Sequence, residues 1–288
     1  MKIKELGYLG VRCPYPEEWL RFGLDVLGMQ GSMDATGQVQ LRMDEHRQRI
    51  MVEAGDSSAL AWVGWDVADH AGLTEARADL AAAGVAVHDG TVGDCESRGV
   101  TAMIWFDDPA ANRVELFWGP TGQNPFVSAR PGLGGFDTTH GLPHLALVVP
   151  DLDAAVAFYQ GPLGFDESDR ISGPFEARFL RINDRHHSLV LFEGERCAVD
   201  HLLVEVSDIH DLGAALDAAR TAGFEPAVSV GYHPPDAMLS CYFPTPAGFR
   251  IEYGITLAGR QSPPWGHVGL LASVGATTIT PGLAGTGR

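Results

Sequence analysis

The sequence is poor in basic residues. It has 20 Lys and Arg against 37 Asp and Glu, so the formal net charge of the 288-residue chain is −17, and the acidic residues are spread along it. A field of this sign repels phosphate backbones and anionic lipid headgroups. We therefore expect neither nucleic acid nor a membrane surface as a partner.

Long apolar runs are also missing. No segment reaches the roughly 18 consecutive apolar residues that a membrane-spanning helix needs. The start, MKIKELGYLG, has no apolar stretch after its lysines of the kind found in a secretory signal. We expect a cytoplasmic protein.

Paired cysteines are the third absence. Cys13, Cys95, Cys197 and Cys241 are far apart, and no CxxC pair occurs. Closely spaced pairs are typical of disulfide frameworks and of cysteine-based zinc sites. We therefore expect reduced thiols.

The sequence does contain an internal repeat. Four times, a short apolar strand is followed by an amphipathic helix and further strands, and the second half of the chain restates the first. The opening strands are predicted at 6–11, 60–67, 142–149 and 200–206. Each following helix ends at a glycine suited to a left-handed conformation, namely Gly28, Gly84, Gly164 and Gly223. The pattern predicts an α+β protein made of four βαβββ modules.

A stretch rich in Gly and Pro separates the halves. The segment GPTGQNPFVSARPGLGGFDTTHG follows the last strand of the first half and is typical of a linker. We place an N-terminal domain at residues 1–125, a linker at 126–140 and a C-terminal domain at 141–268. A tail rich in small residues, at 269–288, is predicted to be loosely ordered.

Two histidines and a glutamate stand at corresponding positions of the modules in the second half. They are His144, His201 and Glu252, and each lies in an otherwise apolar strand, where an unpaired charge is unfavourable. A single buried histidine is usually an ordinary core residue, but three such positions together favour a site. Two imidazoles and one carboxylate form a ligand set that leaves open positions on ferrous iron.

The first half lacks this ligand set. Tyr8 and Trp62 occupy the places that the two histidines have in the second half, and only Glu115 matches its counterpart. The sequence therefore predicts a metal site in the C-terminal half alone.

Further acid and base groups lie in the second half. His186 and His187 open a strand, His233 is in the loop VGYHPPD, and Tyr242 is in the strand that follows. These groups are suited to moving protons beside a metal. Strand alternation allows only one of the two adjacent histidines to point inward.

On these residues, the chain resembles the type I extradiol dioxygenases of the vicinal oxygen chelate superfamily, and among them most the 2,3-dihydroxybiphenyl 1,2-dioxygenases. The matching segments are GLPHLALVV, NDRHHSLVLF, VDHLLVEVSDIHDLGAALD, GYHPPDAMLSCYFPTPAGFRIEYG and WGH at 265–267. The resemblance covers residues 1–268 and is strongest after residue 140. It implies that paired βαβββ modules form one open barrel per domain, with iron inside the C-terminal barrel.

The resemblance also implies the metal and its ligands. His144, His201 and Glu252 would bind Fe(II), with Mn(II) as an alternative metal, because these ligands accept both ions. His187, the second histidine of the RHHSL motif, would lie beside the position of O2.

Other residues would bind the substrate. The resemblance implies that His233 and Tyr242 hydrogen-bond its hydroxyl groups and that Asp236 and His186 support the site. Ala146 is small and leaves room for a substrate larger than catechol. One departure is visible after His233, where Pro234 and Pro235 stiffen the loop and alter the substrate wall.

The implied activity is that of an oxidoreductase that inserts both atoms of O2 into a catechol-type aromatic, such as 2,3-dihydroxybiphenyl, and cleaves the ring beside the hydroxyls. The implied assembly is a homo-oligomer of at least two chains. Two alternatives stay open, a metal-dependent isomerase or lyase of the same superfamily and a module that binds an aromatic ligand without catalysis. The sequence does not fix which catechol is the substrate.

Overall fold

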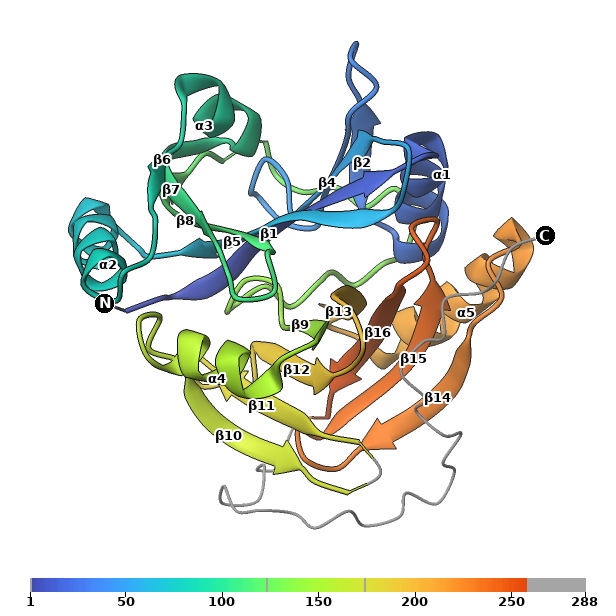
Figure 1. Cartoon of the computed structure of the whole chain (residues 1–288). Coiled ribbons are helices and arrows are strands. Elements are labelled where there is room, and N and C mark those ends of the chain that lie inside the picture. Colours follow the sequence, from blue (N-terminus) through green and yellow to red (C-terminus); the bar gives the residue numbers. More distant parts are fainter. Residues whose placement is uncertain (1, 123, 174, 258–288) are drawn as a thin grey trace.

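The computed structural model describes residues 2–122, 124–173 and 175–257 (Figure 1). The first half contains β1 (Glu5–Cys13), α1 (Pro16–Arg21), the π-helical turn η1 (Phe22–Leu27), β2 (Gln30–Met33), β3 (Val39–Arg42), β4 (Ile50–Ala54), β5 (Ala59–Asp66), α2 (His70–Ala82), β6 (His88–Asp89), α3 (Val92–Arg98), β7 (Val100–Asp107) and β8 (Arg113–Pro120). The second half contains β9 (Leu145–Val149), α4 (Leu152–Gln160), β10 (Asp166–Ile171), β11 (Ala177–Arg181), β12 (Leu189–Glu193), β13 (Ala198–Glu205), α5 (Ile209–Ala222), β14 (Val228–His233), β15 (Met238–Pro244) and β16 (Arg250–Thr256). The WGH motif and the predicted tail lie outside the described residues.

Each half forms one eight-stranded mixed sheet. The strand orders are β2-β3-β4-β1-β5-β8-β7-β6 and β10-β11-β12-β9-β13-β16-β15-β14, so the second sheet repeats the first. Two modules share each sheet through the antiparallel pairs β1–β5 and β9–β13. This arrangement confirms the predicted α+β fold of paired βαβββ modules.

The two faces of each sheet have different neighbours because successive side chains of a strand point to opposite faces. In β9, Leu145 and Leu147 belong to the main core, whereas Ala146 belongs to a separate apolar cluster. In β1, Leu9 belongs to the main core and Tyr8 to another small cluster. Residues at the positions of Tyr8 and His144 therefore face the inside of their own curled sheet.

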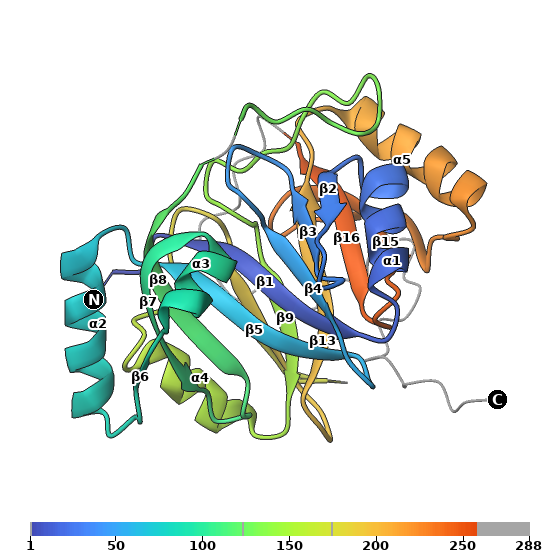
Figure 2. The same ribbon diagram turned by 90° about the horizontal axis from the view of Figure 1, so that it is seen from above.

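The main core joins the two halves. Trp19 of α1 packs on Phe249 with ring centroids 5.6 Å apart, and Phe22 of η1 packs on Phe224 at 4.9 Å. Figures 1 and 2 show the first sheet lying against the second, with β1 and β5 beside β9 and β13. Burying one such aromatic side chain contributes about 1.5–3 kcal/mol, so these contacts hold the halves together.

Three of the four helical segments end next to the predicted glycine, namely Gly28, Gly84 and Gly223, and all four predicted glycines are left-handed. Gly28, Gly84, Gly164 and Gly223 have φ values of 75°, 77°, 70° and 82°, in the left-handed region that glycine adopts readily. The third helix is shorter than predicted, because α4 ends at Gln160 before the Gly-Pro pair that follows it.

Several elements were not predicted from the sequence. They are the short strands β2, β3 and β6, the strands β10 and β14, and the helix α3. His233 is the last residue of β14, so its placement in a loop was wrong, because the strand VSVGYH is partly polar and resembles a loop. His186 and His187 precede β12 instead of opening it, since that strand begins at Leu189.

In the described part of the segment between the halves, no long helix or strand occurs, but its side chains are packed. Ser128 donates from its hydroxyl to the carbonyl of Gly28 at 2.7 Å, and Arg130 donates to the carbonyl of Val26 at 2.7 Å. Phe136 forms an isolated bridge with Val206 of the second half. We propose the predicted limits of the two domains, at 1–125 and 141–268, as the division of the chain.

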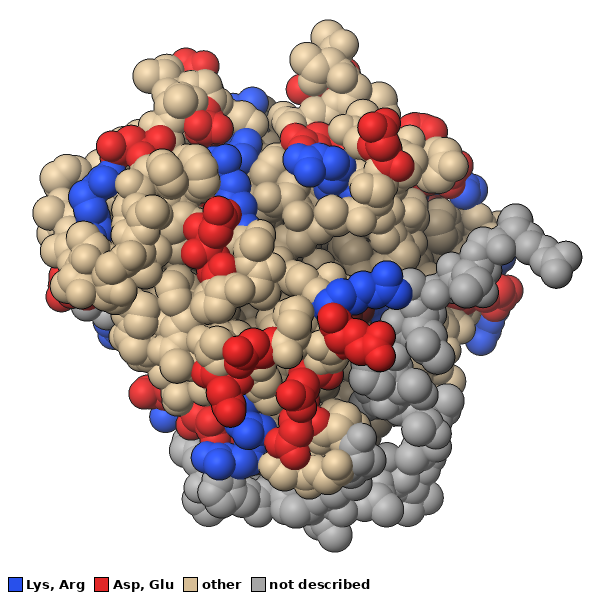
Figure 3. All heavy atoms as spheres, in the orientation of Figure 1, with Lys and Arg blue, Asp and Glu red and all other residues tan. Residues whose placement is uncertain are grey.

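Charged side chains of both signs lie on the surface of the molecule (Figure 3). Figure 3 shows acidic groups spread over the visible face, with basic groups among them. All four cysteines are free, as expected. No helix in the part of the chain that the structure describes is long and apolar enough to cross a membrane.

Candidate metal centre

Three neighbouring strands bring the predicted ligands together. His144 directly precedes β9, His201 lies in β13 and Glu252 lies in β16, and these strands are adjacent in the sheet. The register places His201 opposite Ala146 and Glu252 opposite Leu203. The three side chains therefore converge inside the curled second sheet, where His144, His201 and Glu252 are 3%, 8% and 2% exposed.

The distances among the three side chains fit a shared metal ion. The Nε2 atoms of His144 and His201 are 2.9 Å apart, and Glu252 Oε2 lies 3.2 Å from the first and 3.4 Å from the second. Donor atoms that share a first-row metal at about 2.1 Å are about 3 Å apart when they meet at right angles. Two imidazoles and one carboxylate are also a suitable donor set for such an ion.

His144 and Glu252 have the protonation states that metal binding requires. Burial lowers the pKa of His144 to about 4, although Glu252 opposes this shift, so the imidazole is neutral at pH 7. Burial alone would raise the pKa of Glu252, but its contacts with His144, His201 and His233 hold that pKa below its usual range. Glu252 is therefore a carboxylate.

Residues behind the ligands fix their orientation. Asp200 Oδ2 lies 2.6 Å from His201 Nδ1, and Arg250 donates to both oxygens of Asp200 at 2.5 and 2.6 Å. Ser240 donates from its hydroxyl to Glu252 Oε1 at 2.6 Å, which leaves Oε2 toward the histidines. Such partners orient metal ligands and raise their affinity. Sequence reasoning missed all three, although Asp200 directly precedes His201.

The two adjacent histidines have different surroundings. The ring of His187 lies 4.2 Å from that of His144, and burial lowers the pKa of His187 well below its usual value. His186 Nε2 instead lies 3.9 Å from Asp169 Oδ2 in β10. The structure thus places the ring of His187 against the candidate ligand His144, whereas that of His186 lies toward Asp169.

His233 and Tyr242 approach from the other side of Glu252. His233 Nε2 lies 3.7 Å from Glu252 Oε1, and Tyr242 is opposite Glu252 in the β15–β16 pair. The ring of Tyr242 is 5.4 Å from that of His201. Burial and the charge of Glu252 raise the pKa of Tyr242 well above its usual value, so its phenol keeps its proton.

Asp236 follows in the turn after β14. Burial, and after it the charge of Glu252, raises the pKa of this carboxyl to about 7. Its Oδ1 atom is buried and has no hydrogen-bond partner among the described residues.

An apolar wall lies on the same face of the sheet as His144. It consists of Ala146, Ala177, Val190 and Phe192, with Phe179 packed against it. Phe179 also contacts His187, with ring centroids 5.1 Å apart. This wall provides an apolar surface beside the candidate ligands that suits an aromatic ring.

Comparison with known proteins agrees with this geometry. The Glyoxalase/Bleomycin resistance protein/Dioxygenase superfamily matches residues 141–253, and the dihydroxybiphenyl dioxygenase BphC D1 family matches residues 6–55. An iron-dependent extradiol dioxygenase of Rhodococcus jostii (strain RHA1) is 34% identical, over 91% of either chain. A biphenyl-2,3-diol 1,2-dioxygenase of Paraburkholderia xenovorans (strain LB400) is 35% identical, over 93% of this chain and 96% of the relative. The chain belongs to the extradiol ring-cleaving dioxygenases of the vicinal oxygen chelate superfamily.

Solved structures of extradiol dioxygenases have the same fold. The crystal structure of BphC, a halotolerant catechol dioxygenase, is 33% identical, has a TM-score of 0.88 and covers 94% of this chain, while this chain covers 93% of it. A catechol 2,3-dioxygenase is 30% identical with a TM-score of 0.85, over 95% of this chain and 93% of the other. Both the family and the enzyme class expected from the sequence are thereby confirmed.

Proposed function

We propose that this extradiol dioxygenase uses one Fe(II), held by His144, His201 and Glu252, to cleave a substituted catechol with O2. The observation that carries the proposal is the buried cluster of two Nε2 atoms and one carboxylate oxygen within 4.8 Å of one another. The name of the Rhodococcus jostii relative supports iron. Mn(II) is the alternative metal, because the donor set accepts it as well.

The bound ion would supply the redox chemistry between catechol and O2 and hold the two reactants together, which is a proximity effect. The residues of the chain would do the rest. The apolar wall would receive the aromatic ring. His233 and the protonated Tyr242 would hydrogen-bond the two hydroxyl groups and hold them toward Glu252.

His187 would act on the oxygen that gains negative charge. His187 is 7% exposed and its ring lies against that of His144, so it is placed to donate a hydrogen bond or a proton to an oxygen beside this ligand. Donors fixed in advance at such a position stabilise developing charge strongly. His186 would support His187, since the two Nδ1 atoms are 2.9 Å apart.

The substrate would carry a ring substituent next to the hydroxyls. Ala146 is fully buried in the apolar wall and is smaller than its neighbours Val190 and Phe192, so we expect room there for a ring substituent. Relatives named for biphenyl-2,3-diol, 3-methylcatechol and 1,2-dihydroxynaphthalene also take substituted or fused rings. We therefore propose 2,3-dihydroxybiphenyl as the first substrate to test. Asp236 would complete the polar side of the site.

The test is anaerobic reconstitution with Fe(II), followed by 2,3-dihydroxybiphenyl or catechol in air. We expect one O2 consumed per catechol, a yellow ring-opened product and a higher kcat/KM for the biphenyl compound. Stoichiometric iron without O2 uptake for either compound would contradict the proposal. Cytoplasmic location and a homo-oligomer of at least two chains remain predictions, the second of which size-exclusion chromatography tests.

A further inference from the structure

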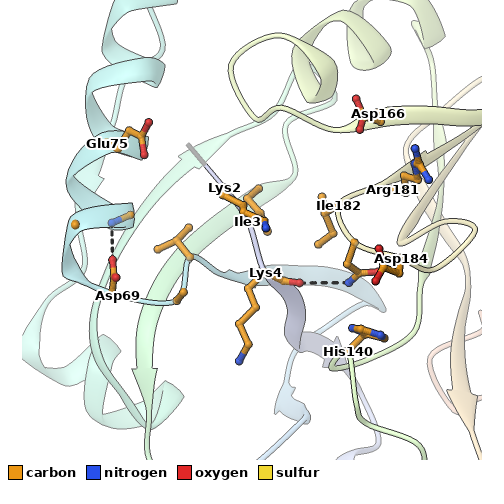
Figure 4. A pocket seen from close by; sticks show the side chains of 15 residues that line it. Lys2, Ile3, Lys4, Asp69, Glu75, His140, Asp166, Arg181, Ile182 and Asp184 are labelled. Carbon is orange, nitrogen blue, oxygen red and sulfur yellow. Dashed lines mark hydrogen bonds between the residues drawn. The ribbon is translucent and has the colours of Figure 1, made fainter.

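A groove of about 800 Å³ runs between the two halves of the molecule (Figure 4). Lys4 and Asp69 line it from the first half, and Asp166 from the second. His140 and Asp184 lie near each other in this groove, and both also line a second pocket. The groove therefore continues into that pocket.

The second pocket, of about 310 Å³, leads from His140 to His144 and His187 at the metal centre. Six of its polar lining residues, which we call the acidic passage, are Asp137, Thr139, Asp184, Arg185, Glu205 and Asp236, and His140, His186 and Thr256 line the same pocket. Arg185 is paired with Glu205, with Nη1 and Oε2 2.5 Å apart, so its charge is compensated. Three further carboxyl groups remain along the passage.

The acidic passage and the apolar wall approach His144 from opposite directions along the strands. β9 and β12 are parallel, with Leu145 opposite Leu189. The passage is lined by residues that precede these positions, among them Pro143 and Arg185. The apolar wall is built from residues that follow them, Ala146 and Val190. The centre therefore has an acidic side and an apolar side.

A polar occupant suits the acidic side. The buried Asp236 Oδ1 has no partner among the described residues, and an unpaired buried oxygen is unfavourable unless water or a cation meets it. A pocket for an aromatic ring is mostly apolar, and carboxylates repel a catecholate anion and the anionic product of ring opening. The same carboxylates attract a divalent cation.

We propose that the acidic passage is the route by which the divalent metal ion reaches and leaves His144, His201 and Glu252, while the aromatic substrate uses the apolar side. This inference rests on the proposed function, because it requires that the three residues bind a metal. It assigns a role to Asp137 and Asp184, which touch none of the three ligands in the described contacts. A route changes the rates of metal binding and release and leaves the affinity unchanged.

The first experiment removes charge from the passage. In the double variant Asp137→Asn/Asp184→Asn, the amide of residue 137 can still accept the N–H of Thr139, which Asp137 Oδ1 accepts at 3.0 Å. The matched control, Glu195→Gln/Asp217→Asn, removes two exposed charges outside the passage and the groove. Apo-protein is mixed anaerobically with Co(II), and the rise of its visible absorbance gives the rate of uptake.

We expect uptake by the passage variant to be roughly three- to tenfold slower than uptake by the control at low salt. The difference should shrink at high salt, where screening is strong. After full loading with Fe(II), the KM for catechol should be that of the unsubstituted protein. Equal uptake rates in the variant and the control would overturn the proposal, and so would a raised KM with unchanged uptake.

The second experiment narrows the passage. Thr139 is exposed and lines it, so Thr139→Trp should slow Co(II) uptake and Co(II) release by the same factor and leave the Kd unchanged. A weaker Kd with an unchanged uptake rate would contradict a route. If the protein takes up metal but cleaves no catechol, the proposed function fails. If it cleaves catechol and both variants load at the unsubstituted rate, only the route fails.

Discussion

The two curled sheets have the same strand order but fill their interiors differently. In the second sheet, Glu252 faces two imidazoles across a site that fits a metal ion. In the first, the fully buried Glu115 occupies the equivalent strand position, and its two oxygens accept from Nε and Nη2 of Arg98 at 3.1 and 3.0 Å. Both sheets thus contain a buried carboxylate. The positive partner of Glu115 is Arg98, and that of Glu252 would be the metal ion.

The remaining space of the first sheet is filled by aromatic side chains. The guanidinium of Arg98 lies 3.5 Å from the ring centroid of Trp62, and Tyr8 donates from its hydroxyl to Glu115 at 2.8 Å. A Cβ at Gly10 would come within 2.0 Å of the Trp62 ring, whereas the equivalent Ala146 belongs to the apolar wall. The same scaffold thus gives a closed structural site in one half and a candidate catalytic site in the other.

The largest expected effect on turnover distinguishes Glu252 from Glu115. Glu252→Gln removes the only charged ligand of the centre, so turnover of 2,3-dihydroxybiphenyl should fall by about a thousandfold or more. Glu115→Gln is the matched control and should keep its kcat at a temperature where it is folded. Equal losses in the two variants, measured as O2 uptake with iron content determined in parallel, would remove the distinction between the sheets.

The next largest effect on turnover distinguishes His187 from His186. His187→Ala should bind the same amount of iron but turn over roughly 10²- to 10⁴-fold more slowly, because a positioned proton donor is lost. His186→Ala should lose much less, since its ring lies toward Asp169. The measurement is kcat with iron content, and full turnover in His187→Ala would show that this histidine has no catalytic role.

Replacing Arg98, the cation that pairs with Glu115 in the first sheet, should change the stability of the protein and not its catalytic rate. Arg98→Met leaves Glu115 buried without its bidentate partner, so the free energy of unfolding should fall by about 3–5 kcal/mol. Arg113, whose Nε lies 2.9 Å from Glu115 Oε1, compensates in part. Urea unfolding measures the loss, and the double variant Arg98→Met/Glu115→Leu should recover part of it. An unchanged unfolding midpoint in Arg98→Met would contradict this account of the closed site.

The smallest effect concerns the support of His201. Asp200→Asn keeps the shape of the side chain but weakens its hold on His201 Nδ1, so metal affinity should fall roughly 10- to 100-fold. At saturating Fe(II), most of the turnover should return. Competition with a ferrous chelator measures the affinity, and an affinity equal to that of the unsubstituted protein would exclude a supporting role.

The parts of the fold that could be predicted from the sequence are those with a strong period of apolar residues. The strands around Tyr8, Trp62 and His201 are apolar and repeat along the chain, so both the modules and the candidate ligands could be found from them. The strand DESDRI of β10 is polar and pairs on one side only, so it resembles a loop in sequence. A polar strand at the edge of a sheet lacks the apolar period by which strands are recognised in a sequence.

The missing parts of the candidate site have a similar cause. Asp200 and Arg250 meet only because β13 and β16 pair in parallel, with His201 opposite Arg250. Arg98 comes from α3, a short helix that was not predicted, and donates to Glu115 in β8. Such contacts depend on register and packing, which the sequence of one strand does not contain.

The most direct test of the difference between the sheets is an anomalous-scattering map of crystals grown anaerobically with Fe(II). The account predicts one strong peak per chain, among His144 Nε2, His201 Nε2 and Glu252 Oε2, and none beside Glu115. A peak beside Glu115, or a peak away from His144 and His201, would contradict it.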